Sequence, residues 1–320
     1  MVRAESTRLI ALIVLAVIYG LVPLVFVNTP YVIFILSQMA FFTAFAYGFN
    51  FLFGYTRQLF LCVGAFIGIG AYITGISIRD GLMGSVEAVL LSTAVVGAIG
   101  WVVSYLSVRR KLVVIFTGIF TLAITLVFNN LVIGLANVTG GETGFRIRGV
   151  SLGPLDALPY NLRYYYVATL TVLAATAIAY YLLFYTRTGY AYRCITDEEV
   201  SAELVGINVS RVKTLTALFS SAFLGFTGAQ YGLFSQLIAP SYFAFSSLDI
   251  PAQIIVILGG RATLLGPHIG SAIIAVVNEA LRFLGPLTQV LYGLTLILLL
   301  AFFRNGIADF IKRKIFSWFF

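Results

Sequence analysis

The sequence predicts an all-α, polytopic helical membrane protein with about ten spans. Sixty per cent of the 320 residues are hydrophobic, and the mean hydropathy is +1.01. Charged residues make up 10% of the chain, whereas a soluble globular chain carries about 25%. Apolar runs near twenty residues long recur from end to end, and that length matches the ~30 Å hydrocarbon core of a bilayer. The alternating pattern of an outer-membrane barrel is absent.

The predicted spans follow the apolar runs, with eight to ten left open as their number. They are 8–27, 31–53, 59–78, 87–107, 111–135, 164–186, 212–237, 248–265, 267–284 and 286–303. We expect the first span to be retained, because no small-residue cleavage site follows it. The run 59–78 is short and Gly-rich, and 248–284 contains Gly-Gly and Gly-Pro pairs. Both regions are therefore expected to be broken or re-entrant, with protein or a watery cavity covering the backbone.

The distribution of basic residues predicts the orientation. Ten spans place both termini on one side, and with the termini inside, fifteen of the twenty Lys and Arg residues lie in inside segments. Such an excess is typical of cytoplasmic loops. The net charge of +8 is therefore interpreted as a membrane signature and not as a sign of nucleic-acid binding. We expect residues 187–211 to form a cytoplasmic loop and residues 136–163 an extracytoplasmic loop.

A quarter of the charge lies in one short segment. Residues 187–213, here called the charged segment, hold eight of the 32 charged residues. Thr196 and Glu199 have the spacing of a capping box, and the acids from Asp197 onward suit the positive end of a helix dipole. Helices that lie on a membrane surface are usually basic. An acidic helix is therefore expected to meet a groove in a soluble partner.

The same helix is predicted to carry an apolar stripe and to end at a glycine. Val200, Leu204 and Ile207 recur at helical spacing. Gly206 stands where a C-terminal glycine lets the chain reverse.

Small residues recur at helical spacing in two other places, and such faces let helices approach closely in lipid. They indicate packing within one subunit, or else a dimer seam or pathway wall. The two faces are Gly64, Gly68, Ala71 and Gly75, and Ser221, Gly225, Gly228 and Gly232.

The charged segment resembles the coupling loop of ABC-importer permeases of the branched-chain amino-acid (LivM-type) family. That family's pattern is similar to G-R-A-x-R-A-I-R-D-x-E-x-A-A-x-x-x-G-I, and this chain has GYAYRCITDEEVSAELVGI. The stretches GYTRQLFLCVGAFIGIGAY, TGGETGF and VILGGRATLLGPHIGSA also resemble family motifs, in the family's order, between Asn50 and Gly306. Tyr190, Cys194, Thr196 and Ser201 depart from the coupling-loop pattern.

The resemblance implies a single transmembrane permease domain over 1–320, in the cell membrane. It implies a sister permease subunit, two cytoplasmic ATPase subunits that hold ATP and Mg²⁺, and an extracytoplasmic binding protein that delivers branched-chain or related amino acids. This chain is expected to bind no cofactor and no metal and to be a transport subunit and not an enzyme, because it has no phosphate loop and no nucleophile–base or metal constellation. By the resemblance, the residues that couple to the ATPase are Arg193, Asp197, Glu199, Ala202, Gly206 and Ile207.

Polar side chains inside predicted spans are candidates for the translocation pathway, because such groups are costly in lipid. They line the path or make helix–helix hydrogen bonds. The candidates are Gln38, Asn50, Asn129, Gln230 and Gln253, with Asn130 and Asn278 beside them. Glu279 and Arg282 have the spacing of a local ion pair, and His268 is expected to face a cavity or to cap a helix.

Other functions stay open. A permease for urea, short amides or sugars would share the loop and differ in the pathway. An ion-coupled secondary transporter would be expected to carry an acid inside a span, and no Asp or Glu lies in the middle of a predicted span.

Overall fold

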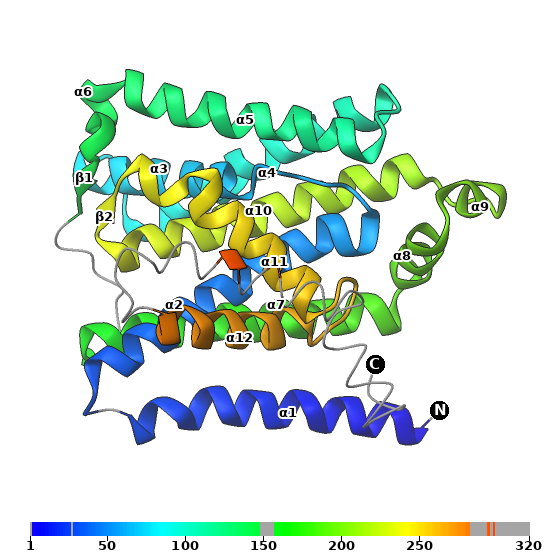
Figure 1. The fold of residues 1–320 in the computed structure, drawn as a ribbon, viewed down its shortest axis with the longest axis horizontal. Helices are drawn as coiled ribbons and strands as arrows, with labels where there is room; N and C mark the ends of the chain where they lie inside the picture. The colour runs from blue at the N-terminus through cyan, green and yellow to red at the C-terminus, as the bar shows by residue number, and fades with distance from the viewer. Residues whose placement is uncertain (1, 27, 148–156, 282–292, 295–296, 298–320) are drawn as a thin grey trace. The chain divides into compact units, whose positions relative to one another are not determined.

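The computed structural model describes residues 2–26, 28–147, 157–281, 293–294 and 297 (Figure 1). The chain divides into two compact units. Unit 1 comprises Met1–Tyr47, Leu158–Tyr181 and Gln253–Phe320, and unit 2 comprises Gly48–Ala157 and Leu182–Ala252. The expected single permease domain over 1–320 stays a prediction.

Unit 1 is built from helices joined by buried hydroxyl and ring contacts. Its helices are α1 (Val2–Val25), most of α2 (Pro30–Phe49) and of α7 (Tyr160–Tyr185), most of α11 (Ile250–Gly259), and α12 (Gly266–Leu281). The His268 ring of α12 lies 3.1 Å from the Tyr19 hydroxyl of α1 through Nδ1 and 3.1 Å from the Thr176 hydroxyl of α7 through Nε2. His268 is therefore a buried packing residue that joins three helices, rather than the cavity-facing or capping residue we expected.

Unit 2 has α10 at its centre, with α3 and α4 packed along it (Figure 1). Its helices are η1 (Asn50–Tyr55), α3 (Val63–Arg79), α4 (Ser85–Arg109), α5 (Val114–Gly134), α6 (Ala136–Thr139), η2 (Gly141–Thr143), α8 (Arg187–Asp197), α9 (Glu199–Leu204), α10 (Val209–Ser235), η4 (Pro240–Phe243) and η5 (Phe245–Asp249). The Asn208 side chain caps α10 by accepting a hydrogen bond from the Arg211 N–H at 2.9 Å. The acid Glu87 lies in the first turn of α4, where the helix dipole favours it.

Both small-residue faces pack inside unit 2. A Cβ at Gly70 would lie 2.3 Å from the Gly225 carbonyl oxygen, and one at Gly228 would lie 2.3 Å from the Ile67 carbonyl oxygen. A Cβ at Gly232 would meet Ala71 at 2.9 Å. The backbones of α3 and α10 therefore approach as only glycine permits, which agrees with packing within one subunit.

A short two-stranded ladder is an exception to the all-helical prediction. Strands β1 (Phe145–Arg146) and β2 (Leu237–Ile238) pair antiparallel, with Phe145 opposite Ile238. The glycines before β1 make this contact possible: Gly144 has φ +67°, and a Cβ there would overlap the Ile238 carbonyl oxygen. The Thr139–Phe145 stretch thus folds as a tight turn onto the segment after α10.

Non-helical backbone precedes α3, where the sequence places a broken segment at 59–78. The Leu61 N–H donates to the Thr121 hydroxyl of α5 at 2.9 Å, and the Leu61 carbonyl accepts from the Thr125 hydroxyl at 2.8 Å. Buried threonines thus satisfy backbone groups that lipid would leave unpaired. The expectation that this segment and residues 248–284 are broken or re-entrant stays a prediction.

The chain is a multi-pass helical membrane protein, as predicted. Among the described residues, four helices are long and apolar enough to cross a membrane, and three more are apolar but shorter. The four are Pro30–Tyr55, Ser85–Arg109, Val114–Gly134 and Leu162–Tyr185, and the shorter ones are Leu12–Pro23, Val63–Arg79 and Phe245–Gly259. The count of about ten spans stays a prediction, and the tenth, 286–303, lies largely outside the described residues.

Candidate functional site

The charged segment forms two short helices, α8 and α9, where the sequence predicts one. Glu198 separates them in an extended conformation, with φ −157° and ψ 124°. Thr196 lies in the last turn of α8, and its hydroxyl donates to the Tyr192 carbonyl at 2.7 Å and to the Tyr55 carbonyl at 3.2 Å. The predicted capping box is therefore wrong, because Thr196 is inside a helix and its hydroxyl bonds elsewhere.

Glu199 forms an ion pair in place of the predicted cap. The Lys213 ammonium of α10 lies 2.6 Å from Glu199 Oε1. The side chains are 13% exposed for Lys213 and 35% for Glu199, so water screens this pair less than a fully exposed one. The pair fixes the start of α9 to the first turns of α10.

Gly206 makes the chain reversal that the sequence predicts. Its φ is +86°, its N–H donates to the Glu203 carbonyl at 3.0 Å, and the Ile207 N–H donates to the Ala202 carbonyl at 3.1 Å. These two bonds form a Schellman motif at the end of α9. The hydrophobic contact typical of the motif is present too, since Ile207 packs against the cluster that contains Ala202.

The apolar residues of α9 divide into an inner and an outer set. Ala202 is 1% exposed and packs with Ile195 and Val209. Val200 and Leu204 are exposed, and Leu204 reaches 83%. The predicted stripe is therefore correct for Val200 and Leu204 and wrong for Ile207, which turns inward after the reversal at Gly206. The adjacent Val205 is also exposed; Val200, Leu204 and Val205 are here called the apolar tip.

The remaining predicted coupling residues lie on α8. The Arg193 guanidinium stands over the Phe184 ring at 5.6 Å and over the Tyr190 ring at 5.9 Å. The Asp197 carbonyl accepts a hydrogen bond from the Arg57 guanidinium at 3.2 Å. All six predicted residues thus lie on α8, on α9 or in the turn after it, and their role toward a partner stays a prediction.

Further contacts tie the charged segment to the helices beneath it. The Tyr192 hydroxyl lies 2.9 Å from the Thr216 hydroxyl of α10, and burial raises the pKa of Tyr192. Gln58 accepts from the Ser104 hydroxyl of α4 at 2.6 Å and donates to the Lys213 carbonyl at 3.0 Å. The base of the segment is therefore fixed to both α4 and α10.

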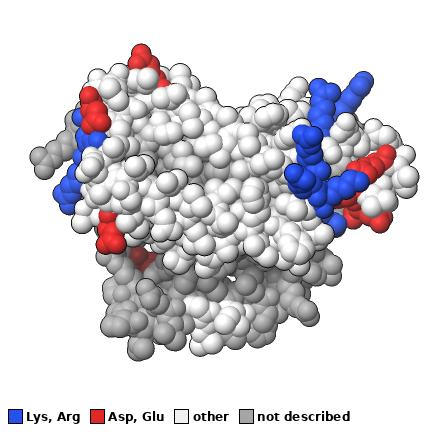
Figure 2. All heavy atoms as spheres, turned by 90° about the horizontal axis from the view of Figure 1, so that it is seen from above, with Lys and Arg blue, Asp and Glu red and all other residues white. Residues whose placement is uncertain are grey.

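The exposed charged side chains that the structure describes in unit 2 lie at two ends. Figure 2 shows blue and red groups at either end of the face that α5 covers, with a broad uncharged band between them. One end holds the charged segment, with Arg57 bonded to it. The other end holds α6 and β1, with Arg79 in contact with Val138 and Phe145 and paired with Asp80. At this second end the Arg79 guanidinium lowers the pKa of Asp80. An uncharged band between charged ends suits a membrane-spanning unit.

The pathway candidates differ in their burial and in their hydrogen bonds. Asn50 is fully buried at the start of η1, and Asn129 has a buried side-chain oxygen that accepts no hydrogen bond from the described residues. Gln253 likewise has a buried Nε2 without an acceptor among those residues. Gln230 lies half-buried on α10. Asn130 bonds back to the Leu126 carbonyl of its own helix at 2.8 Å.

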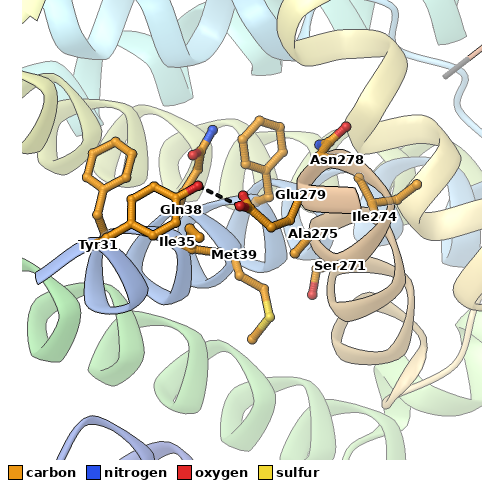
Figure 3. Close-up of a pocket in the computed structure, with 11 residues that line it drawn as sticks. Tyr31, Ile35, Gln38, Met39, Ser271, Ile274, Ala275, Asn278 and Glu279 are labelled. Atoms are coloured by element: carbon orange, nitrogen blue, oxygen red, sulfur yellow. Dashed lines mark hydrogen bonds between the residues drawn. The ribbon is translucent and has the colours of Figure 1, made fainter. Parts of the chain in front are cut away.

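Gln38 and Asn278 line the same pocket. Within unit 1, α2 and α12 enclose a pocket of about 430 Å³ whose lining includes Gln38, Asn278 and Glu279 (Figure 3). Glu279 accepts a hydrogen bond from the Tyr31 hydroxyl at 2.6 Å. Arg282, its predicted ion-pair partner, lies outside the described residues.

A comparison with protein families decides the class of this chain. The family described as the branched-chain amino acid transport system permease component matches residues 31–300. The chain belongs to this family. It is thus a permease of a family of transport subunits, and its apolar helices agree with that assignment.

The names of curated relatives of this permease indicate two kinds of substrate. The high-affinity branched-chain amino acid transport system permease protein LivM of Salmonella typhimurium is 22% identical over 84% of this chain and 68% of its own length. The ribose import permease protein RbsC of Haemophilus influenzae is 26% identical over 88% of this chain and 86% of its own length. LivH of Salmonella typhimurium, from the same system as LivM, is 33% identical over 33% of each chain. No solved structure matches this permease.

Sequence reasoning missed the contacts of several buried or part-buried polar residues in this permease. Gln58 and Lys213 lie in matched motifs, but only the fold reveals that they link the charged segment to α4 and α10. Asp249 was placed at the edge of a predicted span, yet it is 0% exposed. Its carboxyl group lies against Gly64 in the first turn of α3. A buried acid is therefore present in this apolar region, and the sequence argument from the absence of such an acid does not hold.

Proposed function

We propose that this chain is one of two permease subunits of an ABC importer in the cell membrane, carrying branched-chain or related amino acids. The family and the LivM and LivH relatives support an amino-acid substrate and a paired sister permease. In this proposal two cytoplasmic ATPase subunits hold ATP and Mg²⁺, this chain holds no cofactor, and an extracytoplasmic protein delivers the solute. Both termini face the cytoplasm.

The geometry of the charged segment carries the proposal. Its base is fixed by the Lys213–Glu199 ion pair and by the hydrogen bonds of Arg57 and Tyr192. Its apolar tip is exposed, although exposed leucine and valine are unfavourable in water. An apolar tip on a fixed base suits a groove in a soluble partner. When the ATPase subunits close, a force on the tip would pass to α10 through Lys213 and to α4 through Gln58.

The first test places a charge on the apolar tip. Leu204→Glu removes about 1.5–3 kcal/mol of binding free energy that comes from burying the leucine side chain. It also places a carboxylate in the proposed groove without a partner, which costs further free energy. We expect ATPase subunits that co-purify with the permease to fall at least about tenfold. Val86→Glu is the matched control: Val86 is 73% exposed at the other end of unit 2, in the first turn of α4. Equal ATPase yields from both variants would overturn the coupling role.

A ribose permease is the second candidate, because the RbsC match covers more of this chain than the LivM match does. Uptake into proteoliposomes that contain the whole transporter and its binding protein distinguishes the two. We expect ATP-dependent uptake of labelled L-leucine. Preferential uptake of D-ribose would instead show that the chain belongs to a ribose importer.

A further inference from the structure

The pocket of unit 1 has an apolar wall and a polar end. Ile35, Met39 and Ile274 supply aliphatic surface, and Gln38, Asn278 and Glu279 supply the polar groups. Figure 3 shows Glu279 reaching from α12 toward Tyr31 on α2. The pocket has a volume of about 430 Å³, which is within the usual range of small-molecule sites.

Glu279 brings a negative charge to this pocket. Tyr31 donates a hydrogen bond to its carboxylate, but a tyrosine hydroxyl carries no charge. Within the described residues no Lys or Arg lies within ion-pair distance of Glu279. A carboxylate in an apolar protein is stabilised by a cation, so the pocket favours a ligand that carries one.

Two amides stand beside this carboxylate. The side chains of Gln38 and Asn278 line the same pocket and make no hydrogen bond within the part of the chain that the structure describes. Each amide offers two N–H donors, which suit an anionic oxygen. A carboxylate, two amides and an aliphatic wall together complement the ammonium, carboxylate and side chain of an aliphatic amino acid.

We propose that this pocket is a substrate site that receives an aliphatic amino acid, with its ammonium group at Glu279 and its carboxylate at Gln38 and Asn278. The inference rests on the proposed function and extends it to named residues. Tyr31 is the second residue of α2, and Glu279 is close to the end of α12. In the proposed orientation both ends face the extracytoplasmic side, where a binding protein would release the solute.

The charge of Glu279 favours an amino acid over a sugar. A sugar would satisfy the amides with its hydroxyl groups but would bring no counter-charge to the carboxylate. The ammonium group of an amino acid supplies both a counter-charge and strong donors, and such charge-assisted hydrogen bonds are roughly twice as strong as neutral ones.

Photo-crosslinking of the assembled transporter in lipid nanodiscs tests the site. The probe is photo-leucine, the diazirine analogue of leucine, and mass spectrometry maps the labelled peptides. We expect labels within residues 31–42 and 271–279. L-Leucine and 3-methylbutylamine, which keep the ammonium group, should protect the site better than 4-methylpentanoate, which lacks it. Labelling only elsewhere, or better protection by D-ribose than by L-leucine, would overturn the inference.

Two variants assign the polar groups. Glu279→Gln removes the charge and should lower labelling at least about tenfold, whereas Glu87→Gln, at an exposed acid on α4, should not. Asn278→Asp places an anion beside the ligand carboxylate and should weaken protection by L-leucine while keeping that by 3-methylbutylamine. Size-exclusion profiles identify misassembled variants, and unchanged labelling in a correctly assembled Glu279→Gln transporter contradicts the site.

Uptake by the unaltered transporter separates this inference from the proposed function. If the proteoliposomes take up no amino acid, the proposed function fails. If they take up L-leucine while the labels fall outside the pocket, only the site assignment fails.

Discussion

At Gly206 the conformation of a single residue decides where the charged segment turns. The residue has φ +86°, and a Cβ there would meet nothing within 4 Å. Glycine is therefore needed for the backbone conformation and not for space. The hydrogen bonds of Gly206 and Ile207 close the end of α9, and the turn directs the chain into α10.

Gly206→Ala should loosen this turn without any steric clash. The left-handed conformation costs an L-residue with a Cβ about 1–2 kcal/mol, which corresponds to a factor of about 5–30. We expect the amide hydrogens of Gly206 and Ile207, or of their replacements, to exchange faster by that factor in native-state hydrogen exchange. Gly206→Asn is the control, since asparagine tolerates this region better. Identical protection in the alanine variant and the original chain would contradict the argument.

The sequence predicts the local backbone structure of the charged segment better than it predicts the tertiary contacts of that segment. The reversal at Gly206 depends on backbone conformation, so a glycine after an apolar repeat is enough to predict it. The capping box fails because Lys213 binds Glu199 and because Thr196 bonds to the Tyr192 and Tyr55 carbonyls. Lys213 is fourteen residues from Glu199, and Tyr55 is far away in the sequence, so no spacing rule indicates these partners.

At the scale of elements, α10 holds unit 2 together by close backbone approach. Gly225 faces α4, and Gly228 and Gly232 face α3; at Gly228 the nearest atom is the main-chain carbonyl oxygen of Ile67. A carbonyl oxygen of a neighbouring helix cannot rotate away as a side chain does. The small-residue spacing is visible in the sequence, but the helices that pack against it are not. The same spacing would occur whether the partner helix belongs to this chain or to a second subunit.

Gly228→Ala tests this packing. Its Cβ would lie 2.3 Å from the Ile67 carbonyl oxygen, so α3 and α10 must separate, and overpacking of this kind costs about 1–3 kcal/mol. We expect a lower thermal midpoint of the purified chain in detergent. Gly134→Ala is the control, because Gly134 ends α5 with no atom within 4 Å of its Cβ and alanine has the higher helix propensity. A midpoint equal to that of Gly134→Ala would show that the helices do not approach this closely.

At the scale of the whole molecule, the arrangement of charge determines how the chain lies in a membrane. Unit 2 separates a predominantly basic set of residues, around the charged segment, from a smaller charged set at its other end (Figure 2). The positive-inside rule then predicts that the charged segment faces the cytoplasm. Composition alone was enough to predict a polytopic helical protein, whereas the division into two units depends on contacts between distant segments.

Cysteine labelling in intact cells tests this orientation. Glu142 and Glu198 are both exposed and lie at opposite ends of unit 2, so Glu142→Cys and Glu198→Cys report the two sides. The background replaces Cys62 and Cys194, the two native cysteines. We expect a membrane-impermeant maleimide to label Glu142→Cys in intact cells and Glu198→Cys only after lysis, because a side chain facing the cytoplasm is shielded by the bilayer. The reverse pattern would invert the topology and place the apolar tip where no ATPase could reach it. Labelling of both from outside would mean that the uncharged band does not span the membrane.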